Sequence, residues 1–82
     1  MYYTYILFSL KDKKTYVGYT QDFKRRFGEH NSGEVRSTKH RQPLEVLLLE
    51  NLPTMREAKI RESWWKSGAG RRKLKELFNQ SK

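Results

Sequence analysis

The sequence has no cysteine, only two prolines and no long apolar run. Without thiols it can form neither a disulfide nor a thiolate zinc site, and this composition fits a reducing compartment. No apolar segment approaches the roughly 18 residues of a membrane span, and the first residues lack the basic start and cleavage site of a signal peptide. We therefore expect a soluble, cytoplasmic protein whose stability comes from packing.

Acidic residues are also scarce. Nine Asp and Glu face 18 Lys and Arg, which leaves a net charge of +9 on 82 residues. Residues 53–82 alone carry nine Lys and Arg against three Glu. Such a charge predicts a polyanionic partner, with nucleic acid as the leading candidate. A basic surface that serves only solubility is the competing interpretation, and charge alone gives the two about even weight.

The chain shows no repeat, no low-complexity tract and no flexible linker at which it could be divided. We expect one domain over residues 1–82. A domain of this size buries only roughly 60–65% of the surface that its unfolded chain exposes, so its core must be thin.

Two segments rich in aromatic and branched residues open the chain, YYTYILFS and TYVGY, and the polar LKDKK separates them. This composition predicts a β-hairpin. An even-numbered loop, for instance two residues at Asp12-Lys13, would place certain side chains on one face and leave Ile6, Phe8, Val17 and Tyr19 for the other. Those on the first face are Tyr5, Leu7, Ser9, Tyr16 and Gly18. An odd-numbered loop or a bulge would change that relationship.

A helical pattern follows, with Thr20 or Asp22 available as its cap and the NSG tripeptide as its stop signal. Arg26 and His30 lie four residues apart within it, and are therefore neighbours on one helical face. The polar and basic GEVRSTKHRQP after the helix predicts a loop.

The segment LEVLLLENL predicts a third strand, and its near-continuous apolar run indicates burial on both faces. Residues 54–57 then read as a capping box that starts a helix extending to Gly68. A last short helix, RRKLKELF, would turn Leu74, Leu77 and Phe78 inward. The predicted fold class is α+β, a three-stranded antiparallel sheet flanked by helices in the order β-β-α-β-α-α.

Familiar catalytic patterns are missing: the sequence has no glycine-rich phosphate loop, no H-E-x-x-H motif and no thiol nucleophile. Its two histidines, His30 and His40, fall on different predicted elements. On the second predicted helix, Ala58, Glu62 and Trp65 share one face, so that a carboxylate projects from a stripe that otherwise predicts packing. Glu62 is therefore the acid most suggestive of chemistry.

One ordered set of residues carries a family resemblance. It comprises Tyr5 on the first strand, Tyr16-Val17-Gly18 on the second, Arg26 and His30 on the first helix, and Glu62 in RESWW. Together they resemble the GIY-YIG nuclease superfamily over nearly the whole chain, and the small size is similar to that of its stand-alone bacterial members. Where the first motif of that family usually reads Gly-Ile-Tyr, this chain has Tyr3-Thr4-Tyr5 and keeps only the tyrosine.

The resemblance implies metal-dependent phosphodiester hydrolysis, with Tyr5, Tyr16, Arg26, His30 and Glu62 as catalytic residues. Glu62 would be the single carboxylate ligand of Mg²⁺ or Mn²⁺. Arg26 would grip the scissile phosphate, because a guanidinium offers paired donors and keeps its charge. Tyr16, with or without Tyr5, would position or deprotonate the attacking water. His30 would bond either a tyrosine or the phosphate.

Each of these residues also has a structural interpretation. The tyrosines are common strand residues, and Arg26 could be a solvated helix residue with Arg25 as the alternative choice. His30 could end its helix as an imidazolium. Glu62 could form a surface ion pair on its helix. Its possible partners are Lys59, Arg61 and Lys66. We interpret the two tryptophans mainly as packing residues, with stacking on an exposed base as the less favoured alternative.

Exposed basic residues would supply salt-dependent contacts to phosphates. The nucleic-acid-binding candidates are Lys14, Arg36, Lys39, His40, Arg41, Arg71, Arg72 and Lys73. Because no segment reads as a major-groove recognition helix, we expect shape or flexibility to be recognised, as in branches, flaps, nicks or single strands.

The leading hypothesis is a metal-dependent endonuclease that acts on DNA rather than RNA, structure-selective and used in repair or recombination. The alternatives are a nucleic-acid-binding module on the same fold with little turnover, and a small subunit that works only when docked on a protein partner.

Overall fold

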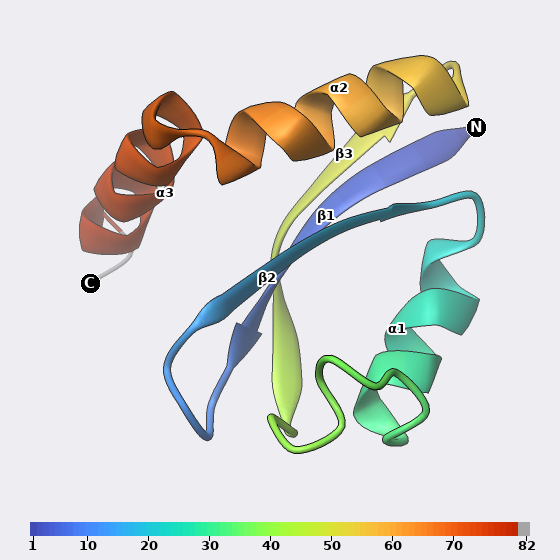
Figure 1. The fold of residues 1–82 in the computed structure, drawn as a ribbon, viewed down its shortest axis with the longest axis vertical. Helices are drawn as coiled ribbons and strands as arrows, with labels where there is room; N and C mark the ends of the chain where they lie inside the picture. Colours follow the sequence, from blue (N-terminus) through green and yellow to red (C-terminus); the bar gives the residue numbers. More distant parts are fainter. Residues whose placement is uncertain (81–82) are drawn as a thin grey trace.

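Three strands and three helices form the fold, seen in a computed structural model that describes residues 1–80. Figure 1 shows their order, β-β-α-β-α-α. The elements are β1 (Tyr2–Ser9), β2 (Thr15–Thr20), α1 (Phe23–Asn31), β3 (Leu44–Leu52), α2 (Met55–Lys66) and α3 (Gly68–Gln80). The predicted α+β fold class is thereby confirmed. No helix in these described residues is long and apolar enough to cross a membrane.

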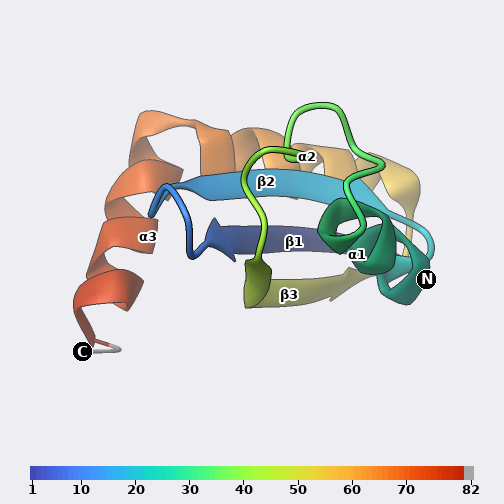
Figure 2. The ribbon, with the colours of Figure 1, turned by 90° about the horizontal axis from the view of Figure 1, so that it is seen from below.

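The sheet order is β2-β1-β3, with both neighbouring pairs antiparallel. Figure 2 shows β1 between the two edge strands. The expectation that the LEVLLLENL strand is buried on both faces was wrong, because β3 is an edge strand in which Val46 and Leu49 are 42% and 44% exposed. The central position belongs to β1, where Thr4 through Leu7 are fully buried. An apolar run indicates that a strand packs against other elements. Whether both of its faces are covered depends on its position in the sheet.

The hairpin turn is longer than a two-residue loop at Asp12-Lys13. The last paired residues are Phe8 and Thr15, and the Ser9 N–H donates to the Lys14 carbonyl at 2.9 Å. Side chains stabilise this wider turn, since the Ser9 hydroxyl accepts from the Asp12 N–H at 3.1 Å and an Asp12 carboxylate oxygen from the Lys14 N–H at 2.9 Å.

The two faces of the hairpin are nevertheless as predicted, because the loop remains even-numbered. Tyr5 lies opposite Gly18 and Leu7 opposite Tyr16, so these four residues share one face. That face packs on α1 through a cluster that includes Phe23 and Phe27. The other face packs on the C-terminal helices, and its cluster contains Ile6, Val17, Trp65 and Leu74. Figure 1 shows α1 on one side of the sheet and α2 with α3 on the other.

Side-chain caps set the starts of α1 and α2. Asp22 accepts from the Arg25 N–H at 3.1 Å, and Thr54 accepts from the Glu57 N–H at 3.2 Å. The Thr54 half of the capping box is confirmed, whereas the Glu57 carboxylate accepts from the Thr54 hydroxyl at 3.3 Å.

Gly70 permits the close packing of α3 against the end of α2. A Cβ on Gly70 would overlap the Trp64 carbonyl oxygen and lie 2.5 Å from the Trp65 Cα. The helix starts at Gly68, earlier than the RRKLKELF segment. Leu74 is buried and Leu77 half-buried, as predicted. The expected inward position of Phe78 concerns a side chain outside the described part of the chain.

Candidate active site

Gly18 lets the Tyr5 ring lie across strand β2. A Cβ at Gly18 would stand 2.6 Å from the Tyr5 Oη and 2.7 Å from its Cζ. Only a glycine leaves this space open, because real Cβ atoms do not approach other atoms so closely. The Tyr5 hydroxyl is thereby carried from the central strand to the edge strand β2.

Tyr16 lies close to Tyr5 because of the observed register. With a two-residue loop, Tyr5 would lie opposite Thr20, four residues from Tyr16 and roughly 13 Å away at the backbone. In the structure Tyr5 lies opposite Gly18, two residues from Tyr16, and the centroids of the two tyrosine rings are 6.3 Å apart. The observed register therefore brings the two tyrosines closer together than a two-residue loop would, and both rings belong to one cluster.

His30 from α1 lies against both tyrosines. Its Nε2 is 3.0 Å from the Tyr5 Oη, and its ring centroid is 4.9 Å from that of Tyr16. The side chain is fully buried. Burial, followed by the nearby Arg26 cation, lowers the pKa of His30 to about 4. His30 is therefore a neutral imidazole bonded to a tyrosine, and the interpretation as a helix-ending imidazolium was wrong.

Tyr5 is a neutral phenol in this environment. Burial raises the pKa of Tyr5 to about 12, against the lowering effect of the Arg26 guanidinium beside its hydroxyl. The pKa values of Tyr5 and His30, about 12 and about 4, keep the shared hydrogen on the Tyr5 oxygen, so that the pair is a neutral phenol and a neutral imidazole. Tyr5 therefore acts through hydrogen bonds, which leaves the half-buried Tyr16 as the better candidate to activate water.

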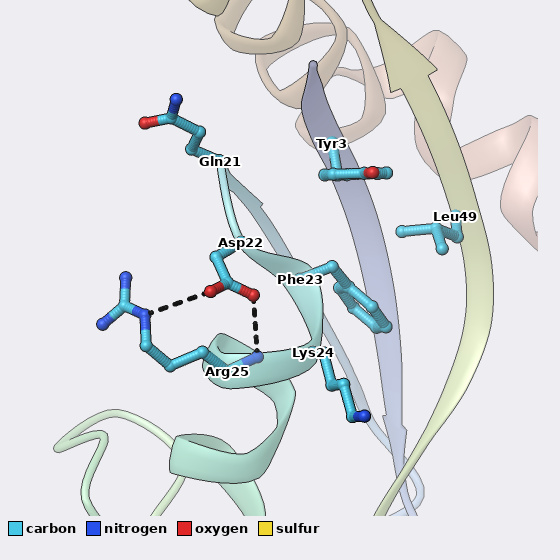
Figure 3. A pocket seen from close by; sticks show the side chains of 7 residues that line it. All are labelled: Tyr3, Gln21, Asp22, Phe23, Lys24, Arg25 and Leu49. Atoms are coloured by element: carbon cyan, nitrogen blue, oxygen red, sulfur yellow. Dashed lines mark hydrogen bonds and ion pairs between the residues drawn. The ribbon is translucent and has the colours of Figure 1, made fainter.

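Arg26, and not Arg25, faces the tyrosines. The charge of Arg26 acts on both Tyr5 and His30, and the Glu29 carboxylate, bonded to its Nη1 at 3.0 Å, raises the pKa of the guanidinium. Arg25 has a side chain 63% exposed and pairs with Asp22 and Glu29. Figure 3 shows Arg25 beside Asp22, pointing away from the sheet. Of the two candidates, Arg26 is therefore the one whose guanidinium lies beside the tyrosines.

Glu62 approaches from the opposite helical layer. Its neighbours on the α2 stripe, Ala58 and Trp65, are buried, while the Glu62 side chain remains 21% exposed. The Glu62 charge contributes to the raised pKa of Tyr5, so the carboxylate acts on the tyrosine cluster. Its Oε2 also lies 3.6 Å from the Lys66 Nζ, the ion pair considered as a structural alternative.

The donor set fits a weakly held Mg²⁺ or Mn²⁺. Among the described residues no group of three or more His, Cys, Asp or Glu could hold a metal ion. Glu62 offers a single, partly exposed carboxylate that already has a cation as neighbour. One carboxylate suffices for Mg²⁺, which usually keeps several waters and takes further oxygens from substrate phosphates.

A second network that the sequence did not suggest holds α2 on β3. Glu50 accepts two hydrogen bonds from Arg61, at 3.0 and 2.8 Å, and one from the Trp65 indole at 3.2 Å. The Arg61 guanidinium lies 4.8 Å from the centre of the Trp64 ring. Because Arg61 is committed to Glu50, it does not pair with Glu62. Both tryptophans pack against the core, as predicted.

The nucleic-acid-binding candidates fall in two regions. The hairpin turn and the 33–43 loop carry exposed Lys14, Arg36, Lys39 and His40, and α3 carries exposed Arg71, Arg72 and Lys73.

Arg41 is placed differently from the other candidates. Its Nε donates to Asp12 at 2.8 Å and its Nη2 to the Thr15 carbonyl at 3.1 Å, so it fastens the 33–43 loop to the hairpin. A groove beside Tyr16 is lined by Arg71 and by Lys66, which the sequence had suggested only as a partner of Glu62.

A separate groove lies at the start of α1. Figure 3 shows Tyr3, Phe23 and Leu49 around it, at the β3 side of the sheet. It does not include Tyr5, Tyr16, His30 or Glu62. Phe23 separates this hollow from the tyrosine cluster, since its ring centroid lies 5.4 Å from that of Tyr5.

Comparison with known proteins supports the same family. Residues 1–75 match the family described as the GIY-YIG catalytic domain. The UPF0213 protein YazA of Bacillus subtilis is 40% identical over 73 residues, which are 88% of this chain and 72% of that protein. The UPF0213 protein SSP2268 of Staphylococcus saprophyticus is 36% identical over 75 residues, 90% of each chain.

A solved structure is also similar. The solution NMR structure of the UPF0213 protein BH0048 from Bacillus halodurans matches with a TM-score of 0.55 and 34% identity, covering 94% of this chain and 85% of that one. The resemblance seen in the tyrosine, arginine and glutamate residues is thus confirmed. By its sequence and by its fold, the chain belongs to the GIY-YIG family of nuclease catalytic domains.

Proposed function

We propose that this protein is a metal-dependent endonuclease that hydrolyses phosphodiester bonds of DNA. The observation that supports this most is the convergence of a guanidinium, that of Arg26, on two tyrosines and His30, whose cluster also feels the Glu62 charge. These groups come from both strands of the hairpin and from helices on both sides of the sheet.

Each residue has a role in the proposed reaction. Arg26 binds the scissile phosphate and offsets the charge that develops on it. Tyr16, half-buried beside the groove, orients the attacking water, and after its own phenolic proton has passed to solvent its phenolate oxygen accepts the proton of that water. Tyr5, whose hydroxyl is bonded to His30, holds this water by a hydrogen bond. Glu62 holds the divalent ion, which when bound supplies positive charge to the phosphate and acidifies water.

Existing ion pairs must yield to substrate in this proposal. Glu29 forms an ion pair with Arg26 at 3.0 Å, and Lys66 forms one with Glu62 at 3.6 Å. A scissile phosphate would compete with Glu29 for Arg26, and the metal ion would compete with Lys66 for Glu62. These two pairs also favour the alternative function, a nucleic-acid-binding module with little turnover, since both charged groups already have partners.

The groove beside Tyr16 gives the substrate strand a path. Lys66 and Arg71 line it with Thr15 and Val17 of the edge strand. Phosphates flanking the cleaved bond would contact these two cations, and those further away the exposed Arg36, Lys39 and His40. Such contacts follow the backbone and do not read bases, which supports a structure-selective activity of the kind used in repair or recombination.

Purified protein incubated with plasmid, single-stranded and branched DNA and with RNA tests this proposal. We expect cleavage of DNA with Mg²⁺ or Mn²⁺, most rapid on branched or nicked substrates, and none with chelator. Binding without cleavage under all metal conditions would instead support the binding module. Cleavage of RNA alone would contradict the proposed substrate.

A further inference from the structure

Thr38 lies behind the His30–Tyr5 pair and is fully buried, although it belongs to the polar 33–43 loop. Its Oγ1 is 2.8 Å from the His30 Nδ1, and the His30 Nε2 is 3.0 Å from the Tyr5 Oη. The Thr38 hydroxyl also donates to the Val35 carbonyl at 3.5 Å. These contacts form one continuous chain from the tyrosine to the loop backbone.

Only one assignment of the hydrogens makes all three contacts hydrogen bonds, including the long one from Thr38 to Val35. A backbone carbonyl can only accept, and a threonine hydroxyl has one hydrogen to give. If the Thr38 hydrogen points to Val35, the Thr38 oxygen accepts from His30, and the imidazole hydrogen must be on Nδ1. The His30 Nε2 is then a bare acceptor, which only the Tyr5 O–H can satisfy.

We propose that Thr38 is a positioning residue that holds His30 in its Nδ1–H form and thereby turns the Tyr5 hydrogen toward His30. The Tyr5 oxygen then presents its lone pairs to the Arg26 guanidinium and to a water at the site. Its function in cleavage rests on the proposed nuclease activity. The direction of the hydrogen bonds does not.

The loop itself keeps Thr38 in place. The Thr38 N–H donates to the Val35 carbonyl at 3.1 Å, and its own carbonyl accepts from the Arg41 N–H at 2.9 Å. The Arg41 carbonyl in turn accepts from the Ser9 hydroxyl at 2.6 Å. Thr38 is thus fixed to the hairpin independently of its side-chain bond to His30.

Nitrogen-15 NMR of the histidine side chains tests the direction of the chain. Because the protein has two histidines, a His40→Gln variant assigns the His30 signals. In the wild type at neutral pH we expect a protonated-type shift for Nδ1 and a bare-type shift for Nε2. The opposite pattern would overturn the proposal without involving any Thr38 variant or any cleavage assay.

Two substitutions then test the role of Thr38. Thr38→Val keeps the shape but removes the hydroxyl, and should shift His30 toward the Nε2–H form or a mixture of both forms. Thr38→Ser should restore the wild-type spectrum. If Thr38→Val fails to fold, Thr38→Ser and the wild-type spectrum still decide. An unchanged His30 spectrum in folded Thr38→Val would overturn the proposal.

Cleavage gives a separate readout. We expect Thr38→Val to cleave DNA roughly tenfold more slowly at unchanged DNA affinity, with rescue by Thr38→Ser. Equal cleavage rates in wild type and Thr38→Val would overturn the functional role. If the wild type cleaves nothing, the nuclease proposal fails, while the NMR spectra still test the hydrogen-bond chain.

Discussion

At the scale of single residues, the site depends on one missing side chain and one buried ring. Gly18 opens the space that the Tyr5 ring occupies, and His30 bonds the hydroxyl that arrives there. The tyrosine cluster therefore requires free space at Gly18 and a neutral His30 that bonds the Tyr5 hydroxyl. Each condition leads to a prediction with a matched control.

Gly18→Ala should displace the Tyr5 ring, because the added Cβ would lie 2.6 Å from the Tyr5 Oη. We expect a loss of about 1–3 kcal/mol of unfolding free energy, measured by chemical denaturation, and a strong loss of cleavage. Gly28→Ala is the control, since a Cβ there meets nothing within 4 Å. Its helix position should give about 0.5–1 kcal/mol of stabilisation. Full activity of Gly18→Ala would contradict the steric account.

The unfolding free energy should fall between about pH 6.5 and pH 5 because of His30. The folded pKa, about 4, lies below the ordinary 6.5, so the unfolded state binds the proton first as pH falls. The expected loss over this range is about 2 kcal/mol. Denaturant titrations of His30→Gln should lose most of this dependence, whereas those of exposed His40→Gln should keep it. An equal slope in His30→Gln would show that other groups cause it.

At the scale of elements, local signals predicted more than non-local ones. The Asp22 and Thr54 caps could be predicted because the capping side chain and the helix start are neighbours in sequence. The turn length and the exposure of β3 could not, since they depend on side-chain bonds of Ser9 and on the order of the sheet.

The same division applies to the candidate site. The order of Tyr16, Arg26 and Glu62 along the chain was enough to suggest the family. The contacts at the site could not be predicted without the register of the hairpin. A shift of two residues between β1 and β2 moves Tyr5 by several ångströms relative to Tyr16. Thr38 and the Glu50–Arg61 pair gave no sequence signal, because their partners lie 8 and 11 residues away on other elements or loops.

Glu50→Gln should weaken the attachment of α2 to β3. It removes the charge that accepts two bonds from Arg61 and one from Trp65. We expect a loss of about 1–2 kcal/mol in denaturant unfolding, given that both charged side chains are partly exposed. Glu76→Gln is the control, since its 3.9 Å pair with Lys73 is solvent-exposed and should change little. Equal effects of the two substitutions would show that the Glu50 network does not hold α2.

At the scale of the whole molecule, positive charge and the groove beside Tyr16 coincide. The net charge of +9 favours any polyanion, but only some cations line that groove. Arg71 does, whereas Lys59 lies with Met55 and Ile60 on another part of α2. Substitutions of Arg71 and Lys59 can therefore distinguish direct contact of DNA with the groove from general attraction of DNA to a basic protein.

Arg71→Gln should weaken DNA binding and lower the slope of log affinity against log salt by about one contact, which is about 0.7–0.9. Lys59→Gln should lower affinity less and leave the slope nearly unchanged. Fluorescence anisotropy of labelled DNA over a salt series measures both. Identical slopes in the two variants would contradict a substrate path through the groove.

The most direct test of the nuclease account is metal-dependent DNA cleavage by Glu62→Gln and Tyr16→Phe, measured beside wild type and Glu76→Gln with DNA binding followed in parallel. The account predicts that the first two variants bind DNA but no longer cleave it, while Glu76→Gln cleaves like the wild type. Cleavage that persists in both Glu62→Gln and Tyr16→Phe would contradict the account, because the activity would then come from another site or another protein.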